Sequence, residues 1–444
     1  MSLKQHDPTL HAILMAERQR QREGVELIPS ENYVSAAVLE AMGSILTNKY
    51  SEGYPGRRYY GGNEHVDEVE RLAQDRAKAL FGVPHANVQP YSGSPANLAV
   101  YFALCRPGDP IMGQNLPDGG HLTHGWNVSI SGTYFTSVPY HVKPDGYIDV
   151  EEVWRLAREH RPRLIWCGAT AYVREFPFAE LASVADEVDA YFVADIAHVA
   201  GLVIAGAHAS PVPHAHVITT TTHKTLRGPR GAMILVTERG LKKDPDLAKK
   251  MDQAIFPGLQ GGPHDHTTAA IAVALGEAMR PEFKAYGAQV VRNAKALGEA
   301  LQRTGLTLVT GGTDNHMLLI DLTPSGLGRG VFLQEALDRV GITVNKNTIP
   351  GEPSSAFYPS GIRLGTPAAT TRGMREGEME RLAAWMGAVA GRVTRFTLPQ
   401  DRKARTEALA EFRRAIQEDA DLARIREEVR QFCLRFPVPG TDAL

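Results

Sequence analysis

A lysine that follows a run of threonines is one residue of this sequence that could do covalent chemistry. Residues 219–231 read TTTTHKTLRGPRG, so His223 and Lys224 come directly after four threonines. The β-branched residues favour a strand, and the glycines and the proline that follow favour a turn. Lys224 is therefore either a solvated charge at the surface or a nucleophilic amine held in a pocket, and this stretch alone does not distinguish the two.

Residues 91–97, YSGSPAN, form a second motif, which could bind an anion. Ser94 suits a helix N-cap and Pro95 suits the first helical position, so we predict a helix that continues to Leu104. The free N–H groups and the dipole of such an N-terminus attract a phosphate. The motif is short, and taken alone it is explained better as an ordinary capped helix.

An apolar run that ends in a carboxylate is the third candidate. Residues 191–195, YFVAD, predict a strand that ends at Asp195, and His198 follows three residues later. In open α/β sheets ligands bind beyond the carboxyl ends of the strands, so Asp195 is placed to hydrogen-bond a ring nitrogen or a metal. The common alternative is that Asp195 only caps a helix after the strand.

Pairs of histidines raise the question of a metal site. His121 and His124 lie three residues apart in GGHLTHG, and the sequences HAH and HDH occur at 214–216 and 264–266. No third ligand with the spacing typical of zinc accompanies any of these pairs, so we expect no metal. In its glycine-rich turn, His121 could equally stack its imidazole on a flat ring.

Together these candidates suit one cofactor, pyridoxal 5′-phosphate. An anion-binding helix N-terminus at 92–94, a strand-end carboxylate at Asp195 and a strand-end amine at Lys224 follow one another along the chain. The phosphate needs N–H and hydroxyl donors, the pyridinium nitrogen needs a carboxylate, and the aldehyde needs an amine with which to form a Schiff base. We therefore favour the nucleophilic amine over the surface charge for Lys224.

The elements that must position these residues alternate along the chain. Strand-like runs at 110–113, 164–168, 191–194, 217–222 and 232–236 alternate with helical stretches such as 150–160 and 179–188. This alternation predicts an α/β layer with a mostly parallel sheet. A long amphipathic helix at about 282–304 then leads to a smaller α+β domain. We also predict a helix that opens at residues 30–32, an ordered functional loop at 47–63 and a solvated, charged helical face at 399–430.

The composition narrows the classes of protein. The 444 residues contain 48 Lys and Arg and 50 Asp and Glu, and the resulting net charge of −2 does not indicate a surface for nucleic acid or membranes. The three cysteines are far apart and lack disulfide or metal spacing, which favours a reducing compartment. No stretch approaches the ~18 apolar residues of a membrane helix, and the N-terminus lacks a signal-peptide pattern. We expect a cytoplasmic protein without nucleic-acid or membrane partners.

The motifs resemble those of the serine hydroxymethyltransferase family, which are pyridoxal-phosphate enzymes of the aspartate-aminotransferase fold (fold type I). The resemblance runs from LIPSENY at 27–33 to SGIRLGTP at 360–367. It is carried by the motifs NKYSEGYPGRRYYGG, VQPYSGSPAN, LPDGGHLTHG, VADIAHVAGL, TTTTHKTLRGPRG, FPGLQGGP and GGTDNHMLLIDL. It implies an α/β large domain with a mostly parallel seven-stranded sheet flanked by helices, and a smaller C-terminal α+β domain. The implied division is an N-terminal helical arm and dimer-interface segment at 1–60, a cofactor-binding domain at 61–282 and a small domain at 283–444.

The resemblance also implies roles for residues around the cofactor. It matches Lys224 to the Schiff-base lysine, with His223 beside it, Asp195 to the partner of the pyridinium nitrogen, and His121 to a histidine stacked on the ring. The further cofactor contacts that it implies are Ser92, Gly93, Ser94, Thr170, His198, Thr221 and, from the neighbouring subunit, Gly261 and Gly262.

Substrate positions follow from the same resemblance. Arg363 matches the arginine that binds the substrate carboxylate, for which a forked guanidinium is well suited. Glu52 matches the glutamate that is credited with proton transfer at the hydroxymethyl group, and Tyr50 is grouped with it as catalytic. The other substrate positions are Ser30, Tyr60 and His198, and the implied folate contacts are Tyr59, Leu116, Gly120, Leu122 and Asn347.

The implied reaction is the reversible interconversion of L-serine and tetrahydrofolate with glycine and 5,10-methylenetetrahydrofolate, in one-carbon metabolism and glycine biosynthesis. The implied assembly is a homodimer in which Tyr50, Glu52, Gly261 and Gly262 complete the active site of the partner.

Two other classes of function remain to be weighed. A folate-independent aldolase for threonine or allothreonine could use the same fold, but the folate-side residues Tyr59, Leu116 and Asn347 argue against it. A non-catalytic scaffold would have no reason to keep all four of Lys224, Asp195, Arg363 and Glu52.

Overall fold

The computed structural model describes residues 2–441, which form two compact units. The larger unit comprises residues 34–291 and 313–315, and the smaller unit comprises the residues before 34, residues 292–312 and the chain from 316 onward. Within residues 2–441, no helix combines the length and the apolar character that are needed to span a bilayer.

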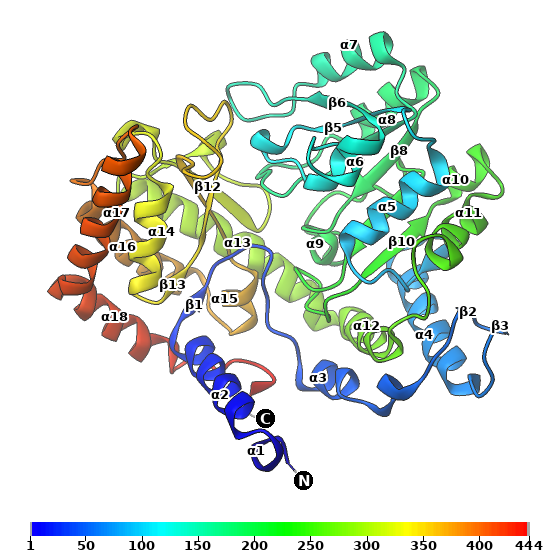
Figure 1. The fold of residues 1–444 in the computed structure, drawn as a ribbon, viewed down its shortest axis with the longest axis horizontal. Helices are drawn as coiled ribbons and strands as arrows, with labels where there is room; N and C mark the ends of the chain where they lie inside the picture. Colours follow the sequence, from blue (N-terminus) through cyan, green and yellow to red (C-terminus); the bar gives the residue numbers. More distant parts are fainter. Residues whose placement is uncertain (1, 442–444) are drawn as a thin grey trace. The chain divides into compact units, whose positions relative to one another are not determined.

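The larger unit is built on a seven-stranded sheet (Figure 1), as the sequence predicts. Its strands run in the order β4-β10-β9-β8-β7-β5-β6. Only β10 is antiparallel to its neighbours; the other contacts between adjacent strands are parallel. The strands are β4 (His85–Asn87), β5 (Pro110–Gln114), β6 (Thr136–Tyr140), β7 (Leu164–Cys167), β8 (Tyr191–Asp195), β9 (Val217–Thr221) and β10 (Ala232–Val236).

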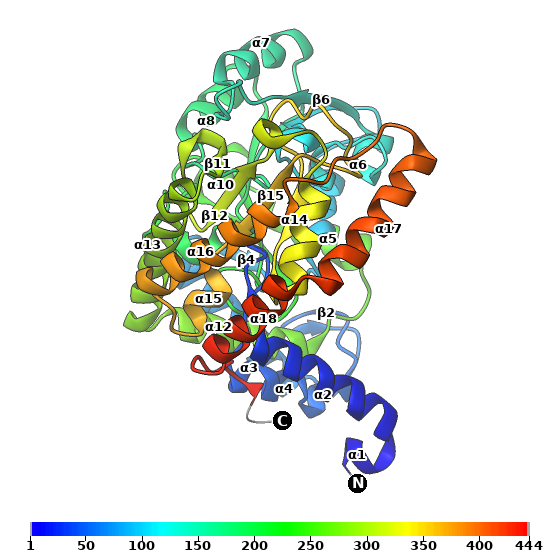
Figure 2. The ribbon, with the colours of Figure 1, turned by 90° about the vertical axis from the view of Figure 1, so that its left-hand side faces the viewer.

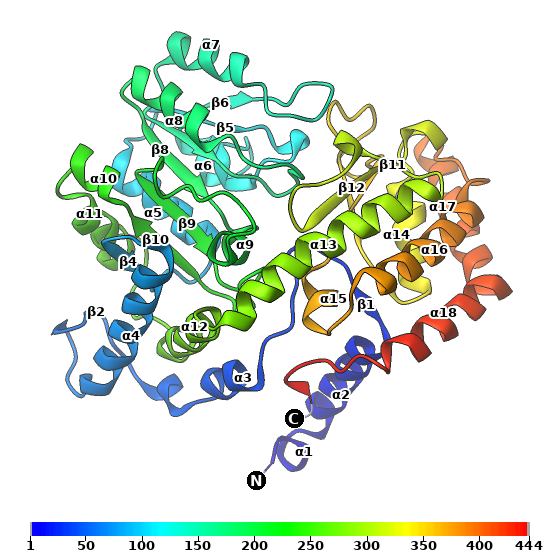
Figure 3. The same cartoon turned by 180° about the vertical axis from the view of Figure 1, so that it is seen from behind.

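Side chains alternate between the two faces of this sheet, and helices cover both faces. In β8, Phe192 and Ala194 join one core cluster while Tyr191 and Val193 join the other. The second cluster contains buried residues of α5 (Gly93–Leu104) and α11 (Leu247–Gln253). The first contains residues of α4 (Glu64–Phe81), α7 (Val150–His160), α8 (Phe178–Glu187), α9 (Ala200–Ala205) and α12 (Asp265–Ala278), some of which are best seen from behind (Figure 3). By this alternation Asp195 lies on the α5 face.

Short elements connect this framework. They are α3 (Ala36–Met42), η1 (Ile45–Asn48), the two-residue hairpin of β2 (Gly53–Tyr54) and β3 (Arg57–Arg58), η2 (Leu116–Asp118), η3 (Leu122–His124), α6 (Ile130–Tyr134), α10 (Glu238–Lys243) and η4 (Ala254–Leu259). The predicted functional loop at 47–63 therefore contains the β2–β3 hairpin.

The smaller unit contains an antiparallel sheet in the order β11-β12-β15-β14 and a parallel pair, β1 and β13. Its elements are α1 (Leu3–His6), α2 (Pro8–Glu23), β1 (Val25–Glu26), β11 (Thr307–Leu308), η5 (Val309–Gly311), β12 (Met317–Asp321), η6 (Thr323–Ser325), α14 (Gly330–Arg339), β13 (Ile342–Thr343), β14 (Asn345–Asn347), β15 (Gly361–Gly365), α15 (Pro367–Thr371), α16 (Glu376–Val393), α17 (Arg402–Glu418) and α18 (Ala420–Cys433). The long helix α13 (Pro281–Arg303) occurs where the sequence predicts it.

Two predictions of where a helix begins are wrong. The helix expected at residues 30–32 begins only at Ala36, because Ser35 is the N-cap whose hydroxyl accepts from Val38 N–H. Helix α5 begins at Gly93 with Ser92 as N-cap, so Pro95 is its third residue; the first-turn N–H groups have no helical partner in any case, and a proline is tolerated there.

The charged stretch at 399–430 is more than a solvated face. Its two helices, α17 and α18 (red in Figure 2), place Phe412, Leu422 and Val429 in the core of the smaller unit. Their charged residues occupy the opposite faces, as in an ordinary amphipathic helix. The high charge of the sequence hides this apolar stripe.

Candidate active site

Asp195 is a largely buried carboxylate of the larger unit. It stands at the carboxyl end of the parallel strand β8, and its side chain is only 11% exposed. Its Oδ2 accepts from Asn97 Nδ2 at 2.8 Å and lies 3.1 Å from His124 Nε2, while its Oδ1 accepts from Ala197 N–H at 3.0 Å. Three donors therefore converge on one carboxylate.

These donors decide the charge of Asp195. Burial alone would raise the pKa of the carboxyl, but the hydrogen bond and the charge of His124, together with the hydrogen bond from Asn97, hold that pKa well below its usual value. Asp195 is therefore an anion at neutral pH, and it can pair with a cationic ring nitrogen.

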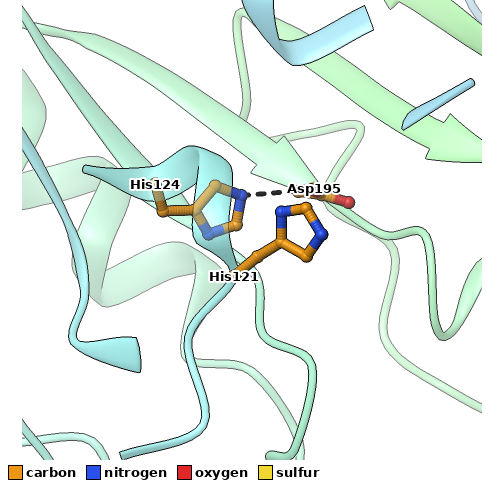
Figure 4. Close-up of side chains that lie close together, drawn as sticks. All are labelled: His121, His124 and Asp195. Atoms are coloured by element: carbon orange, nitrogen blue, oxygen red, sulfur yellow. Dashed lines mark hydrogen bonds and ion pairs between the residues drawn. The ribbon is translucent and has the colours of Figure 1, made fainter. Parts of the chain in front are cut away.

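His121 lies beside Asp195 in the glycine-rich turn before η3 (Figure 4). Its Nδ1 is 2.7 Å from Thr123 Oγ1 and accepts from Thr123 N–H at 3.2 Å. Burial, followed by the charge of His124, lowers the pKa of His121 to about 4. Its imidazole is therefore neutral at neutral pH, which suits a ring that stacks on another flat ring.

His124 also belongs to the site. From the sequence it was considered only as a possible metal ligand together with His121. Its side chain is fully buried and stacks on Trp166 of β7, with ring centroids 4.9 Å apart and an interplanar angle of 12°. Figure 4 shows its Nε2 directed at Asp195, with His121 alongside. One ligand atom from each of His121, His124 and Asp195 lies within 4.8 Å of the others, so the three could also hold a metal ion.

Lys224 follows β9, the strand next to β8 in the sheet. The turn that carries it is closed by Thr222, whose hydroxyl donates to Pro229 O at 2.6 Å and whose carbonyl accepts from Gly228 N–H at 2.7 Å. Burial, and then the charges of Lys224 and Arg230, lower the pKa of the neighbouring His223 to about 3. His223 is therefore a neutral neighbour of the lysine.

The start of α5 lies against the same strand. A Cβ on Gly93 would be 2.8 Å from Thr221 Cγ2, so only glycine lets the helix N-terminus approach the end of β9 this closely. Ser92 makes no side-chain capping bond, and Ser94 is exposed. The first turn of α5 thus combines free N–H groups with two hydroxyls, which is the donor set that a phosphate requires.

Other predicted cofactor and folate positions belong to the same unit. Thr170 N–H donates to Gly119 O at 2.7 Å, and His198 is buried with its carbonyl accepting from Thr225 Oγ1 at 3.0 Å. A Cβ on Gly120 would overlap the carbonyl oxygen of Gln114, so this position requires glycine. Leu116 and His121 both line a cavity of about 240 Å³, while Leu122 is 48% exposed.

The predicted partner-site residues cluster in the same unit. Tyr50 Oη donates to Glu52 Oε1 at 3.2 Å, and a Cβ on Gly262 would lie 3.4 Å from the Tyr50 ring. Gly261 would place a Cβ 3.1 Å from Glu52 Oε1. The charge of Glu52 raises the pKa of Tyr50. Sequence positions 50–52 and 261–262 are therefore neighbours in the folded chain.

Ser51, between Tyr50 and Glu52, fixes this segment. It is fully buried, and its hydroxyl contacts both carboxylate oxygens of Asp265 at 2.7 and 2.9 Å. Arg58, on β3, pairs with Asp67 and Glu70 at 2.8 and 2.6 Å. In contrast, Tyr59 and Tyr60 are 77% and 47% exposed, with Tyr60 edge-on to Tyr50 at 4.8 Å. A rigid backbone thus displays exposed tyrosines.

Arg363, Asn347 and Ser30 belong to the smaller unit. Arg363, on β15, is 7% exposed, and its Nε donates to Asn345 Oδ1 at 2.9 Å. Asn345 pairs with Arg363 across the sheet, so Asn347, two residues further along β14, lies on the same face. Burial lowers the pKa of the Arg363 guanidinium to about 10. Ser30 lies in the turn after β1 and is partly buried.

Asn97, Thr123 and His124 were not predicted as partners of Asp195 and His121. Asn97 is a buried polar residue within the otherwise apolar stretch of α5, and that contrast was the available signal. Thr123 and His124 lie in the quoted motif GGHLTHG, but only the fold shows that they turn inward.

Comparisons with known proteins show the family of this chain. A family model described as serine hydroxymethyltransferase matches residues 3–386. A protein named serine hydroxymethyltransferase from Sorangium cellulosum (strain So ce56) is 56% identical over 440 residues, which cover 99% of this chain and 97% of that protein. One of the same name from Acidothermus cellulolyticus (strain ATCC 43068 / DSM 8971 / 11B) is 56% identical over 437 residues, covering 98% and 96%.

Proposed function

The chain belongs to the serine hydroxymethyltransferase family, and we propose that the residues described above carry the activity of that family in the roles set out below. The protein is a pyridoxal-phosphate-dependent transferase that interconverts L-serine and tetrahydrofolate with glycine and 5,10-methylenetetrahydrofolate. The observation that carries the assignment of the site is the buried, ionised Asp195 at the end of β8, with Lys224 following the adjacent strand β9.

The donor set fits pyridoxal 5′-phosphate. When it is bound, this cofactor supplies an aldehyde that an amine can hold and a protonated ring that withdraws electrons from the substrate. Lys224 is the amine that would hold it, and Asp195 would keep the ring nitrogen protonated. The residues that would hold the phosphate are Ser92, Gly93, Ser94 and Thr221, where Gly93 leaves the space that a Cβ would fill. Thr170 and His198 would contact the cofactor from the remaining sides.

The neutral imidazole of His121 orients the ring by stacking. A protonated imidazole would add a second positive charge beside the pyridinium, and the low pKa of His121 prevents this. His223 is kept neutral in the same way next to Lys224. The site therefore combines an anionic Asp195 with two imidazoles, those of His121 and His223, that stay neutral.

For the substrate, Arg363 supplies a guanidinium for the carboxylate, and Ser30, Tyr60 and His198 supply further polar contacts. Burial of Arg363 strengthens its attraction for an anion because little water competes. Glu52 moves the proton at the hydroxymethyl group, with Tyr50 bonded to it. The residues that would contact the folate are Tyr59, Leu116, Gly120, Leu122 and Asn347.

We propose a homodimer whose active sites are shared between subunits. The support is the cluster of Tyr50, Glu52, Gly261 and Gly262, which has a rigid base at Ser51 and exposed tyrosines on top. Exposed aromatic groups on a rigid support suit a protein interface. In this scheme residues 1–60 form the arm and interface segment, 61–282 the cofactor domain and 283–444 the small domain; residues 1 and 442–444 of these ranges lie outside the described residues.

Cleavage of serine with and without tetrahydrofolate tests this function. We expect a strong dependence on tetrahydrofolate; equal rates would indicate the aldolase alternative. A visible absorbance band should develop when pyridoxal phosphate is added to the protein, and Lys224→Ala should abolish it. Gel filtration that shows a fully active monomer would contradict the shared sites.

A further inference from the structure

Tyr91 holds the segment 260–264 through both its backbone and its side chain. Its N–H donates to Gln260 Oε1 at 3.0 Å, and its hydroxyl donates to Gly262 O at 2.7 Å. Its ring stacks on His264, with ring centroids 4.1 Å apart and an interplanar angle of 5°. Three alternate positions of one short segment are therefore tied to a single residue.

The two glycines inside this segment have free backbone N–H groups. Among the residues that the structure describes, neither the N–H of Gly261 nor that of Gly262 has a hydrogen-bond partner. Pro263 follows and has no N–H. Successive backbone N–H groups can bind one anion together. The segment therefore carries a pair of donors that a ligand can use.

The glycine pair at 119–120 is organised differently. The N–H of Gly119 donates to Leu116 O at 3.0 Å, and the N–H of Gly120 donates to Asn115 O at 2.9 Å. Those donors are used within the chain, so that pair serves a turn. The pair at 261–262 keeps its donors free while the carbonyl of Gly262 is held by Tyr91.

Glycines that bind a ligand through their N–H groups need an anchor, because their backbone is not confined to a few conformations. Ordering a flexible backbone opposes binding, and donors that are ordered beforehand avoid this cost. A phenol hydroxyl is a suitable anchor because it donates to a carbonyl oxygen. Burial, followed by the charge of Glu52, raises the pKa of Tyr91, so the hydroxyl keeps its hydrogen at neutral pH.

We propose that Tyr91 is a positioning residue that orders Gly261 and Gly262 so that their two N–H groups are ready to bind the cofactor phosphate. The proposal rests on the function proposed above, in which these glycines contact the phosphate in the neighbouring subunit, and it adds the group that orders them. Tyr91 also directly precedes the predicted phosphate contacts at 92–94 of its own chain. One residue thereby connects the donors of two phosphate sites.

Tyr91→Phe tests the proposal, because it removes the hydroxyl and keeps the ring that stacks on His264. Dissociation constants are measured for pyridoxal 5′-phosphate and for pyridoxal, which has the same ring and aldehyde but no phosphate. The constant for pyridoxal 5′-phosphate should rise about fivefold, and that for pyridoxal should change by less than about twofold. A general loss of structure would weaken both ligands, so equal weakening would overturn the proposal.

Mixed dimers separate the segment 260–264 from the phosphate contacts at 92–94. One chain is wild type, and the other combines Lys224→Ala with Tyr91→Phe, so the visible absorbance reports a site whose own Tyr91 is intact. Compared with a mixed dimer that carries Lys224→Ala alone, the dissociation constant for pyridoxal 5′-phosphate should rise about fivefold. Equal constants in the two mixed dimers would show that Tyr91 acts only within its own chain, which would also overturn the proposal.

Two further variants provide a control and a second test. Tyr140→Phe is the control, because Tyr140 is buried in the same unit and its hydroxyl donates to the backbone carbonyl of Trp166 at 3.0 Å. It should lower the melting temperature and leave both dissociation constants unchanged. Gln260→Leu removes the other hydrogen bond between Tyr91 and the segment, and it should also weaken binding of pyridoxal 5′-phosphate more than that of pyridoxal. It decides the matter if Tyr91→Phe does not fold.

A measurement on the cofactor-free protein separates this proposal from the proposed function. In glycine-labelled protein, the amide signals of Gly261 and Gly262 are assigned by their loss when each glycine is replaced with alanine. Their nitrogen relaxation should show larger backbone motion in Tyr91→Phe than in wild type or Tyr140→Phe, and unchanged relaxation would overturn the proposal. If wild type develops no visible absorbance with pyridoxal phosphate, the proposed function fails instead, and the relaxation still decides whether Tyr91 orders the segment.

Discussion

The surroundings of Asp195 and those of Glu52 are organised in opposite ways, although both carboxylates are assigned to one reaction. Asp195 is 11% exposed and receives three donors from its own unit. Tyr50, which donates a hydrogen bond to Glu52, is 54% exposed, and nearby Tyr59 is 77% exposed. Around Glu52, the buried hydrogen bond and ion pairs are made by Ser51 and Arg58. These contacts fix the backbone and do not involve the reactive side chains.

The difference shows which part of the chemistry a single chain can organise. The Asp195 network is complete within one unit, so its charge and hydrogen-bond directions are set before any ligand binds. The Glu52 segment has a rigid base but an open upper side, as expected for groups that act on a ligand held partly by another surface. Four experiments test this contrast, in order of decreasing effect.

Matched carboxylate substitutions should separate the two regions most strongly. Asp195→Asn removes the charge and turns an amide donor toward Asn97 or His124, so we expect turnover to be lost and the free energy of unfolding to fall by about 1–3 kcal/mol. Glu52→Gln should also impair turnover severely but change the free energy of unfolding by less than about 0.5 kcal/mol. Urea unfolding and steady-state kinetics provide the two readouts. Equal losses of stability would remove the distinction.

Acid should destabilise the buried histidines of the larger unit. Burial lowers the pKa values of His121 and His216 to about 4 and that of His223 to about 3, below the ordinary 6.5. The unfolded chain therefore binds protons that the folded chain does not bind, so stability is lost as pH falls from about 6.5 toward 4, by up to about 3 kcal/mol for each histidine. Urea unfolding across this range measures the loss. His216→Asn, whose amide oxygen can still accept the Phe192 N–H, should flatten the profile; an unchanged slope would count against this origin.

Removal of the Ser51 hydroxyl tests the rigid base of the exposed region. Ser51→Ala leaves the buried Asp265 without this donor, and we expect a loss of about 1–2 kcal/mol. Turnover should fall because Tyr50 and Glu52 lose their support, while the pyridoxal-phosphate absorbance remains. Ser183→Ala, which removes an exposed hydroxyl on α8, is the control and should change neither. An unchanged free energy of unfolding in Ser51→Ala would show that the hydrogen bond to Asp265 does not stabilise the fold.

Tyr59 should give the smallest structural effect. Because its ring is largely exposed, Tyr59→Ala should alter the free energy of unfolding by less than about 0.5 kcal/mol. The KM for tetrahydrofolate should rise several-fold with the pH profile of cofactor absorbance unchanged. A large drop in melting temperature would instead place Tyr59 among the groups that hold the fold.

Local patterns accounted for much of the architecture. The apolar runs at 164–168, 191–194 and 232–236 predicted strands that the structure contains, because a strand buried on both faces leaves a continuous apolar signature. The start of α5 was placed two residues too late, since Ser92 and Ser94 are equally good caps in sequence. The buried stripe of α17 and α18 was hidden by their charged faces.

By itself the sequence determined the chemical inventory: a strand-end lysine in TTTTHKTLRGPRG, a strand-end Asp195, an anion-binding helix start and the motifs of one family. Those features are local, and residue type with spacing is enough to state them. Tertiary contacts were needed to show that Asn97, Thr123 and His124 contact Asp195 or His121, and that Glu52 lies near Gly261. Asn97, Asp195 and the turn at 121–124 come from segments far apart in the sequence, and the hydrogen bonds between them exist only once the chain has excluded water.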